Sequence, residues 1–183
     1  MERLTSTEDF RAFQNRLAAA QNPNVPTLVI PAGTCGQASG ASDLIRVAKR
    51  ELLEKSLAEK IQLRITGCHG FCEMEPSVLI EPQRTFYPKV GIMEMVRIVE
   101  AVAEGKVLED LLFVDPETGK PIEKQDDIPF FKKQVRTILS RNEQVDPILI
   151  KDYIAIGGYS GLAKVLSEHS PDWVINEIKA SGL

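Results

Sequence analysis

The chain has 183 residues, of which 43% are hydrophobic and 26% charged, and its formal net charge is −4. These values are typical of a soluble globular protein with one or two domains and a core that needs no disulfide support. The negative charge argues against nucleic acid as a main partner. No apolar run approaches the roughly 20 residues of a membrane-spanning helix, which excludes direct membrane insertion. The N-terminus, MERLTSTEDF, also lacks the apolar stretch of a signal peptide, so we expect a cytoplasmic location.

The first 105 residues alternate between helical and strand-like patterns. Thr5, with Glu8 three residues later, is typical of a capping box at the start of a helix over 5–21. Apolar periodicity and breaks at proline and glycine then predict strands over 27–30, 61–66, 77–81 and 85–90, and helices over 41–59 and 93–104. Pro88 indicates an edge position for the fourth strand. A strand–helix–strand unit followed by a hairpin and a covering helix is a thioredoxin-like topology, which we assign to residues 1–105.

The pattern changes after Gly105. Residues 111–122 predict a strand, a turn at Asp115-Pro116 and a returning strand. Short helices are then predicted over 129–141, from 146 to 156, over 159–168 and from 170 onward, two of them starting at Asp-Pro or Ser-Pro. In the first of these helices, Lys132, Lys133, Arg136 and Arg141 indicate a solvated basic face. The expected fold class is therefore α/β, a thioredoxin-like ferredoxin domain at 1–105 followed by a mainly helical, incomplete segment at 106–183.

The three cysteines of the chain all lie in glycine-containing loops. Cys35 falls in GTCGQASGA directly after an apolar run, and Cys68 and Cys72 fall in TGCHGFCEMEP. Thiolates gathered on short loops are how proteins hold iron–sulfur clusters or zinc. An odd number of cysteines also argues against a disulfide framework. Cys35, Cys68 and Cys72 are therefore the candidate metal- and cofactor-binding residues, and no residue is assigned a catalytic role.

Other interpretations of these cysteines remain open. Each one can be a small buried hydrophobe. Zinc held by the three thiolates and His69 is chemically possible, although the adjacent residues Cys68 and His69 make strained co-ligands. A thioredoxin-type dithiol is disfavoured because C-x-x-C is absent. A further alternative is that the chain has kept the thioredoxin-like fold and no longer binds a cluster.

TCGQASGA (34–41) and TGCHGFCEMEP (66–76) resemble the thioredoxin-like [2Fe-2S] domain at the N-terminus of a family of flavin- and NADH-binding subunits. The family occurs in NAD-dependent and electron-bifurcating hydrogenases and in formate dehydrogenases, and it is related to the flavin subunit of complex I. PFFKKQVRTIL, DYIAIGGYSGLAKVL and INEIKASGL resemble the segment that leads into the flavin domain. The resemblance implies a [2Fe-2S] cluster, electron transfer, and partner iron–sulfur subunits in a hydrogenase, formate dehydrogenase or complex I-like assembly.

The chain departs from this family in two places. The family uses four cysteines, and the position that matches the missing one is Gly40, with Ser39, Ser42, His69 or water as candidate replacements. The sequence also lacks the glycine-rich loop that holds flavin and NADH in the relatives. We therefore expect FMN and NAD only in a complete subunit and no NADH turnover from this chain alone. The alternative function is a cluster-free thioredoxin-like docking domain that holds partner subunits.

Overall fold

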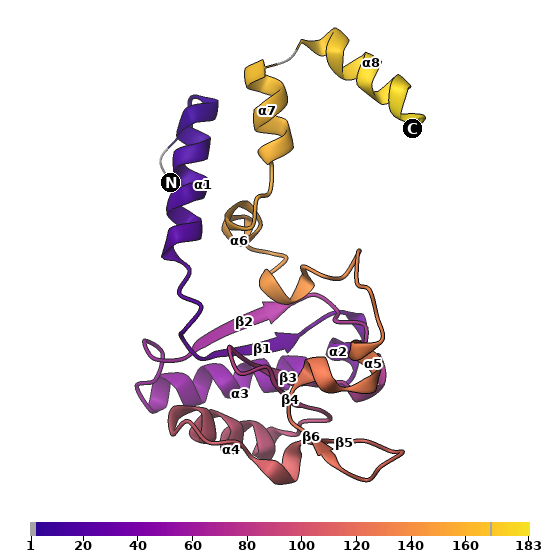
Figure 1. The fold of residues 1–183 in the computed structure, drawn as a ribbon. Helices are drawn as coiled ribbons and strands as arrows, with labels where there is room; N and C mark the ends of the chain where they lie inside the picture. The colour runs from indigo at the N-terminus through magenta and orange to yellow at the C-terminus, as the bar shows by residue number, and fades with distance from the viewer. Residues whose placement is uncertain (1–2, 169) are drawn as a thin grey trace. The chain divides into compact units, whose positions relative to one another are not determined.

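A computed structural model describes residues 3–168 and 170–183 (Figure 1). The chain forms two compact units, one of Asn22–Ile148 and the other of Met1–Gln21 with Leu149–Leu183. The spatial division therefore falls at residues 21 and 148, whereas the sequence pattern placed a domain boundary after residue 105. Among the described residues, no helix is both long enough and apolar enough to cross a membrane.

A four-stranded mixed sheet organises the larger unit. Its strands are β1 (Thr27–Pro31), β2 (Gln62–Thr66), β3 (Val78–Glu81) and β4 (Thr85–Tyr87), in the order β2-β1-β3-β4. β1 and β2 are parallel, β3 is antiparallel to β1, and β4 is antiparallel to β3. β1 lies between two partners and every one of its residues is buried, which explains its unbroken apolar run. β4 is an edge strand of this sheet, as Pro88 predicted.

Two long helices cover one face of the sheet. α3 (Ala41–Glu54) crosses from β1 to the parallel strand β2, and α4 (Ile92–Ala103) follows β4. They lie side by side (Figure 1) and form one core with the sheet, whose fully buried members include Leu28, Ile30, Val78, Leu44, Met95 and Ile98. A short additional helix, α2 (Thr34–Ala38), precedes α3. This strand order and these connections define a thioredoxin-like α/β fold and confirm the predicted fold class.

The segment after α4 belongs to the same compact unit and builds a second core. It contains the 3-10 turns η2 (Glu109–Leu111), η3 (Gln125–Asp127) and η4 (Asn142–Gln144), the hairpin β5 (Phe113–Val114) and β6 (Pro121–Ile122), and α5 (Pro129–Lys132). Adjacent residues of a strand point to opposite faces of a sheet, so Tyr87 joins the helical core while Phe86 joins this second core. Phe113, Ile128 and Phe131 complete it. The hairpin confirms the strand–turn–strand prediction.

The helix predicted over 129–141 is wrong, because α5 ends at Lys132. An amphipathic helix of this length is stabilised mainly by burying its apolar face. Val135 and Ile138 are instead 93% and 87% exposed, so no such face is buried. Arg136 and Asn142 donate hydrogen bonds to backbone carbonyls of the cysteine loop. After Lys132 the chain is therefore held by these tertiary contacts and does not continue as the predicted helix.

The end of one other predicted helix shifts for a local reason, and a predicted turn contains a short helix. α3 ends at Glu54 rather than at 59, because Ser56 takes a left-handed φ of 55° and the chain closes a Schellman motif. In that motif Leu57 N donates to Leu52 O at 2.8 Å and Ser56 N donates to Leu53 O at 3.1 Å. Cys35 was predicted in an open turn but lies in the first turn of α2.

The second unit is helical. It contains α1 (Thr7–Ala20), α6 (Ile150–Ala155), α7 (Ser160–Glu168) and α8 (Pro171–Ser181). Ser6, not Thr5, caps α1 by accepting a hydrogen bond from Asp9 N. Gln14 of α1 donates to the carbonyls of Ile154 and Gly158, at 2.9 and 3.2 Å, and so connects α1 to the end of α6 and to the turn that follows it.

Candidate metal centre

The sheet brings the two cysteine loops together. Cys35 follows β1 and Cys68 follows β2, and because these strands are parallel neighbours their carboxyl ends meet at one edge. The loops pack closely there. A Cβ added at Gly33 would lie only 3.0 Å from Cys68 Cβ. The structure therefore places the three predicted site residues at a single location.

The thiol of Cys72 interacts with those of Cys68 and Cys35. The Sγ atoms of Cys68 and Cys72 are 3.9 Å apart, close to the ~3.8 Å that separates two thiolates bound at 2.3 Å to one tetrahedral metal ion. Hydrogen bonding with Cys35, and then with Cys68, raises the pKa of Cys72 to about 12. These interactions therefore favour the protonated form of the Cys72 thiol. A metal would release that proton, because the thiolate is the ligand.

A backbone amide points at one of these sulfurs. Gly70 N donates to Cys68 Sγ at 3.1 Å. Gly70 has a φ of +89°, a conformation that glycine adopts without the penalty of a Cβ. Backbone donors to sulfur stabilise the negative charge of a bound metal–thiolate group. This geometry agrees with the glycine-spaced pattern of the loop.

Position 40, where the sequence resemblance implies a fourth cysteine, is open. Gly40 caps α3 with a φ of +105°, and a Cβ built on it meets no atom within 4 Å. Ser39 and Ser42 on either side are exposed. Oxygen donors are therefore available near this position, whereas Gly40 has no side chain to offer.

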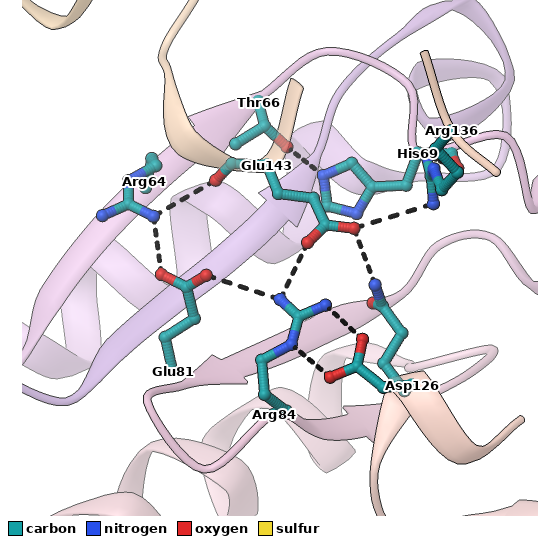
Figure 2. Close-up of polar contacts among 9 residues, drawn as sticks. Arg64, Thr66, His69, Glu81, Arg84, Asp126, Arg136 and Glu143 are labelled. Atoms are coloured by element: carbon teal, nitrogen blue, oxygen red, sulfur yellow. Dashed lines mark hydrogen bonds and ion pairs between the residues drawn. The ribbon is translucent and has the colours of Figure 1, made fainter. Parts of the chain in front are cut away.

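His69, the other candidate ligand, is directed elsewhere. Its ring is only 3% exposed, and its Nε2 lies 2.8 Å from Thr66 Oγ1 in β2. Burial is the main cause that lowers its pKa to about 4, so the imidazole is neutral. Figure 2 shows the ring between Thr66 and Glu143. Among the described residues, no group of three or more His, Cys, Asp or Glu is arranged to hold a single metal ion.

A network of charged side chains surrounds His69 (Figure 2). Glu143 of η4 accepts a hydrogen bond from Arg84 Nη1 at 2.7 Å, and its backbone carbonyl accepts one from Arg64 Nη1 at 3.1 Å. Burial opposes ionisation of Glu143, but the charge and hydrogen bond of Arg84, together with His69 and Gln125, outweigh it and hold the pKa of this carboxyl below its usual value. Arg64 also pairs with Glu81 of β3 at 2.7 Å. These contacts attach η4 to the sheet.

An aromatic cluster supports the loop from its other end. Phe71, directly before Cys72, stacks on Phe130 with ring centroids 4.2 Å apart and an interplanar angle of 6°. Its ring also meets the edge of Phe131 at 5.4 Å. Such pairs add about 0.5–1.5 kcal/mol beyond the burial of their area. Residues after the predicted boundary at 105 therefore fix the position of Cys72.

Sequence reasoning missed the contribution of residues 130–143 to the site. Arg136 was assigned to a solvated helix face, but its side chain is 16% exposed and bonds to His69 O. Asn142 Nδ2 donates to Cys68 O at 2.9 Å. The only signal in the sequence is that the segment holds a Phe-Phe pair and several basic residues, which does not reveal their partners.

Glu75, which follows the cysteine loop, gives a testable pH dependence. Burial raises its pKa from 4.5 to about 7, although Ser77 N donates to its Oε2 at 2.9 Å. A folded-state pKa above the unfolded one means that stability is fully present below pH 4.5 and is lost as the pH rises through 7. We expect Glu75→Gln, which stays neutral, to gain roughly 2.5 kcal/mol of unfolding free energy over the wild type between pH 5 and 8.

Urea unfolding of the reduced, metal-free chain across this range measures the effect, with the exposed Glu73→Gln as the matched control. The low pKa of His69 works in the opposite sense, adding stability as the pH rises from 4 to 6.5. This effect of His69 is present in the wild type and in both variants, so it cancels when their pH profiles are compared. Parallel pH profiles for Glu75→Gln and the wild type would contradict the prediction.

Known proteins with similar sequences match parts of the chain. No family model matches it. Over 52 residues it is 48% identical to the NADP-reducing hydrogenase subunit HndC of Solidesulfovibrio fructosivorans, covering 28% of this chain and 10% of HndC. Over 70 residues it is 27% identical to a 2Fe-2S ferredoxin of Clostridium pasteurianum, covering 38% of this chain and 69% of the ferredoxin. The chain thus spans about a tenth of HndC and about two thirds of the ferredoxin.

Solved structures of ferredoxins are also similar to part of the chain. The thioredoxin-like [2Fe-2S] ferredoxin from Aquifex aeolicus superimposes with a TM-score of 0.45 and 18% identity, covering 48% of this chain and 94% of the ferredoxin. Another structure of an Aquifex aeolicus ferredoxin of this type gives a TM-score of 0.43, 20% identity and coverage of 48% and 88%. For the present chain, the strand order and connections themselves define the thioredoxin-like class.

Proposed function

We propose that this chain is an electron-transfer module that holds a [2Fe-2S] cluster on Cys35, Cys68 and Cys72. The observation that carries the proposal is the convergence of three thiols from two loops, with the Gly70 amide directed at a sulfur. A binuclear cluster divides its ligands between two irons, so it does not require three ligands around one ion. Serine oxygen, imidazole or water completes the set, and of these the exposed serines beside Gly40 are favoured over the buried His69.

The position of the thiols suits electron exchange. A [2Fe-2S] cluster exchanges electrons reversibly at a potential set by its charge, the hydrogen bonds to its sulfurs and its exposure to solvent. Cys35 and Cys72 are exposed, so this edge of the sheet is accessible to a redox partner. The protein residues bind and orient, and none of them needs to act as an acid, a base or a nucleophile.

The matches to a hydrogenase subunit and to a ferredoxin support a wider proposal. The module would belong to an NADH-dependent oxidoreductase complex of the hydrogenase, formate dehydrogenase or NADH:quinone oxidoreductase type. It would pass electrons to or from flavin and the clusters of neighbouring iron–sulfur subunits. FMN and NAD would bind in other parts of the complete subunit.

A second candidate function is a cluster-free docking domain that holds partner subunits on the thioredoxin-like fold. Gly40 favours it, because the structure supplies no side chain at the position of the family's fourth ligand.

Iron and sulfide analysis separates the two functions. We expect protein purified without oxygen to contain about two irons and two acid-labile sulfides per chain and to show a [2Fe-2S] electron paramagnetic resonance signal after reduction. A colourless protein without iron after chemical reconstitution would support the docking function instead. One zinc per chain, without sulfide, would contradict both and indicate a mononuclear site.

A further inference from the structure

Residues 133–144, here called the strap, lie against the loop that carries Cys68. Asn142 Nδ2 donates to Cys68 O at 2.9 Å, and Arg136 Nη2 donates to His69 O. Apolar contact accompanies these bonds, since a Cβ added at Gly70 would lie 3.2 Å from Leu139 Cδ1. The strap therefore contacts consecutive residues of the cysteine loop through both hydrogen bonds and packing.

Arg136 is itself held in place. Its guanidinium lies 5.3 Å from the centre of the Phe131 ring, and its Nη1 is 3.7 Å from Glu143 Oε1. Glu143 is fixed in turn by Arg84 and, through its backbone, by Arg64 of β2. A side chain restrained on both sides loses little further freedom when it binds the loop, so its hydrogen bond orients the acceptor effectively.

The carbonyl that Arg136 holds belongs to the same peptide unit as the amide that binds sulfur. The unit between His69 and Gly70 contains the His69 C=O, which accepts from Arg136, and the Gly70 N–H, which donates to Cys68 Sγ at 3.1 Å. A trans peptide is planar, with its C=O and N–H pointing in opposite directions. Fixing the oxygen therefore aims the N–H at the sulfur. A cation at the oxygen also polarises the unit and strengthens that donor.

We propose that Arg136 is a positioning residue of the metal centre, which acts through the His69–Gly70 peptide to direct and strengthen the amide donor to Cys68 Sγ. The effect on a bound cluster rests on the proposed function, whereas the effect on the amide does not. A stronger donor to sulfur stabilises the more negative, reduced state of a cluster. Arg136 therefore raises the reduction potential and restrains the loop before any metal binds.

The first test uses the reduced, metal-free full-length chain. We expect Arg136→Met to speed hydrogen exchange of the Gly70 amide by about tenfold, measured by nuclear magnetic resonance, because a charge-assisted hydrogen bond is lost. Arg136→Lys, which keeps the charge and can still donate, should restore much of the protection. Lys133→Met removes an exposed cation from the same strap and serves as the matched control, with wild-type exchange expected.

The second test measures the reduction potential of the reconstituted chain. We expect the potential to fall in Arg136→Met, to fall less in Arg136→Lys and to stay unchanged in Lys133→Met. If Arg136→Met does not fold, Arg136→Gln replaces it in both tests. Glutamine is neutral but can still donate a hydrogen bond, so we expect a smaller increase in Gly70 exchange and a smaller fall in the reduction potential. Wild-type exchange and wild-type potential in a folded Arg136 variant would overturn the proposal. Faster Gly70 exchange in a chain that binds no iron would instead defeat the proposed function and leave the positioning role standing.

Discussion

Cys72→Ser should cause the largest loss of cluster retention among single substitutions in this chain. The Sγ of Cys72 lies 3.9 Å from that of Cys68, and interaction with Cys35 raises the pKa of Cys72. A serine oxygen is a hard donor and a poor substitute for thiolate on iron–sulfur sites. Loss of a residue that hydrogen-bonds to a metal ligand typically lowers metal affinity or activity by about 10–100-fold. We therefore expect loss of the ligand itself to lower cluster retention by more than about tenfold.

The measurement is the iron and sulfide content after anaerobic purification, together with the electron paramagnetic resonance spectrum of the reduced protein. Cys68→Ser should also lower the iron and sulfide content, but less, and circular dichroism should show that both variants keep the fold. Glu73→Gln, which changes an exposed neighbour of Cys72, is the matched control, and Ser39→Ala tests a candidate fourth ligand. Full iron content and an unchanged spectrum in Cys72→Ser would show that this thiol is not a ligand. A loss in Ser39→Ala as large as in Cys72→Ser would identify Ser39 as the fourth ligand.

Gly36→Ala should disrupt both the fold and the metal centre. A Cβ at this position would lie 2.4 Å from the carbonyl oxygen of Pro31, and the obstacle is backbone rather than a mobile side chain. β1 cannot move away, because it is fully buried and paired on both sides. α2 must therefore shift, and Cys35 shifts with it. Overpacking of this kind costs about 1–3 kcal/mol and sometimes more.

Chemical unfolding of the metal-free chain measures that loss, and iron content after reconstitution reports the displacement of Cys35. Gly67→Ala is the matched control, since a Cβ there meets only the Asn142 side chain, at 3.4 Å. We expect it to change the free energy of unfolding by less than about 0.5 kcal/mol. Equal stability of Gly36→Ala and the wild type would mean that α2 is free to move away from β1 at no cost.

The sequence by itself determined the fold class and the grouping of the cysteines. The run TLVI predicts a buried strand, and the long helical connection before residues 61–66 is of the kind that a parallel pair of strands needs, as β1 and β2 are. Once these strands are neighbours, Cys35 and Cys68 must meet at their carboxyl ends. Periodicity, glycine positions and cysteine spacing are local properties, so the sequence carries them directly.

Only the tertiary structure decided what the segment after residue 105 does. Arg136 has helical spacing with Lys132 and Lys133, and spacing alone cannot show that its partner is a carbonyl 67 residues earlier in the chain. Likewise His69 was a candidate ligand by its position beside Cys68, but its ring is buried against Thr66. The direction of a side chain is set by whatever packs against it, and those neighbours come from distant parts of the sequence. The approach of the cysteine loops was therefore predictable from the sequence, while the residues that support them became evident only in the folded chain.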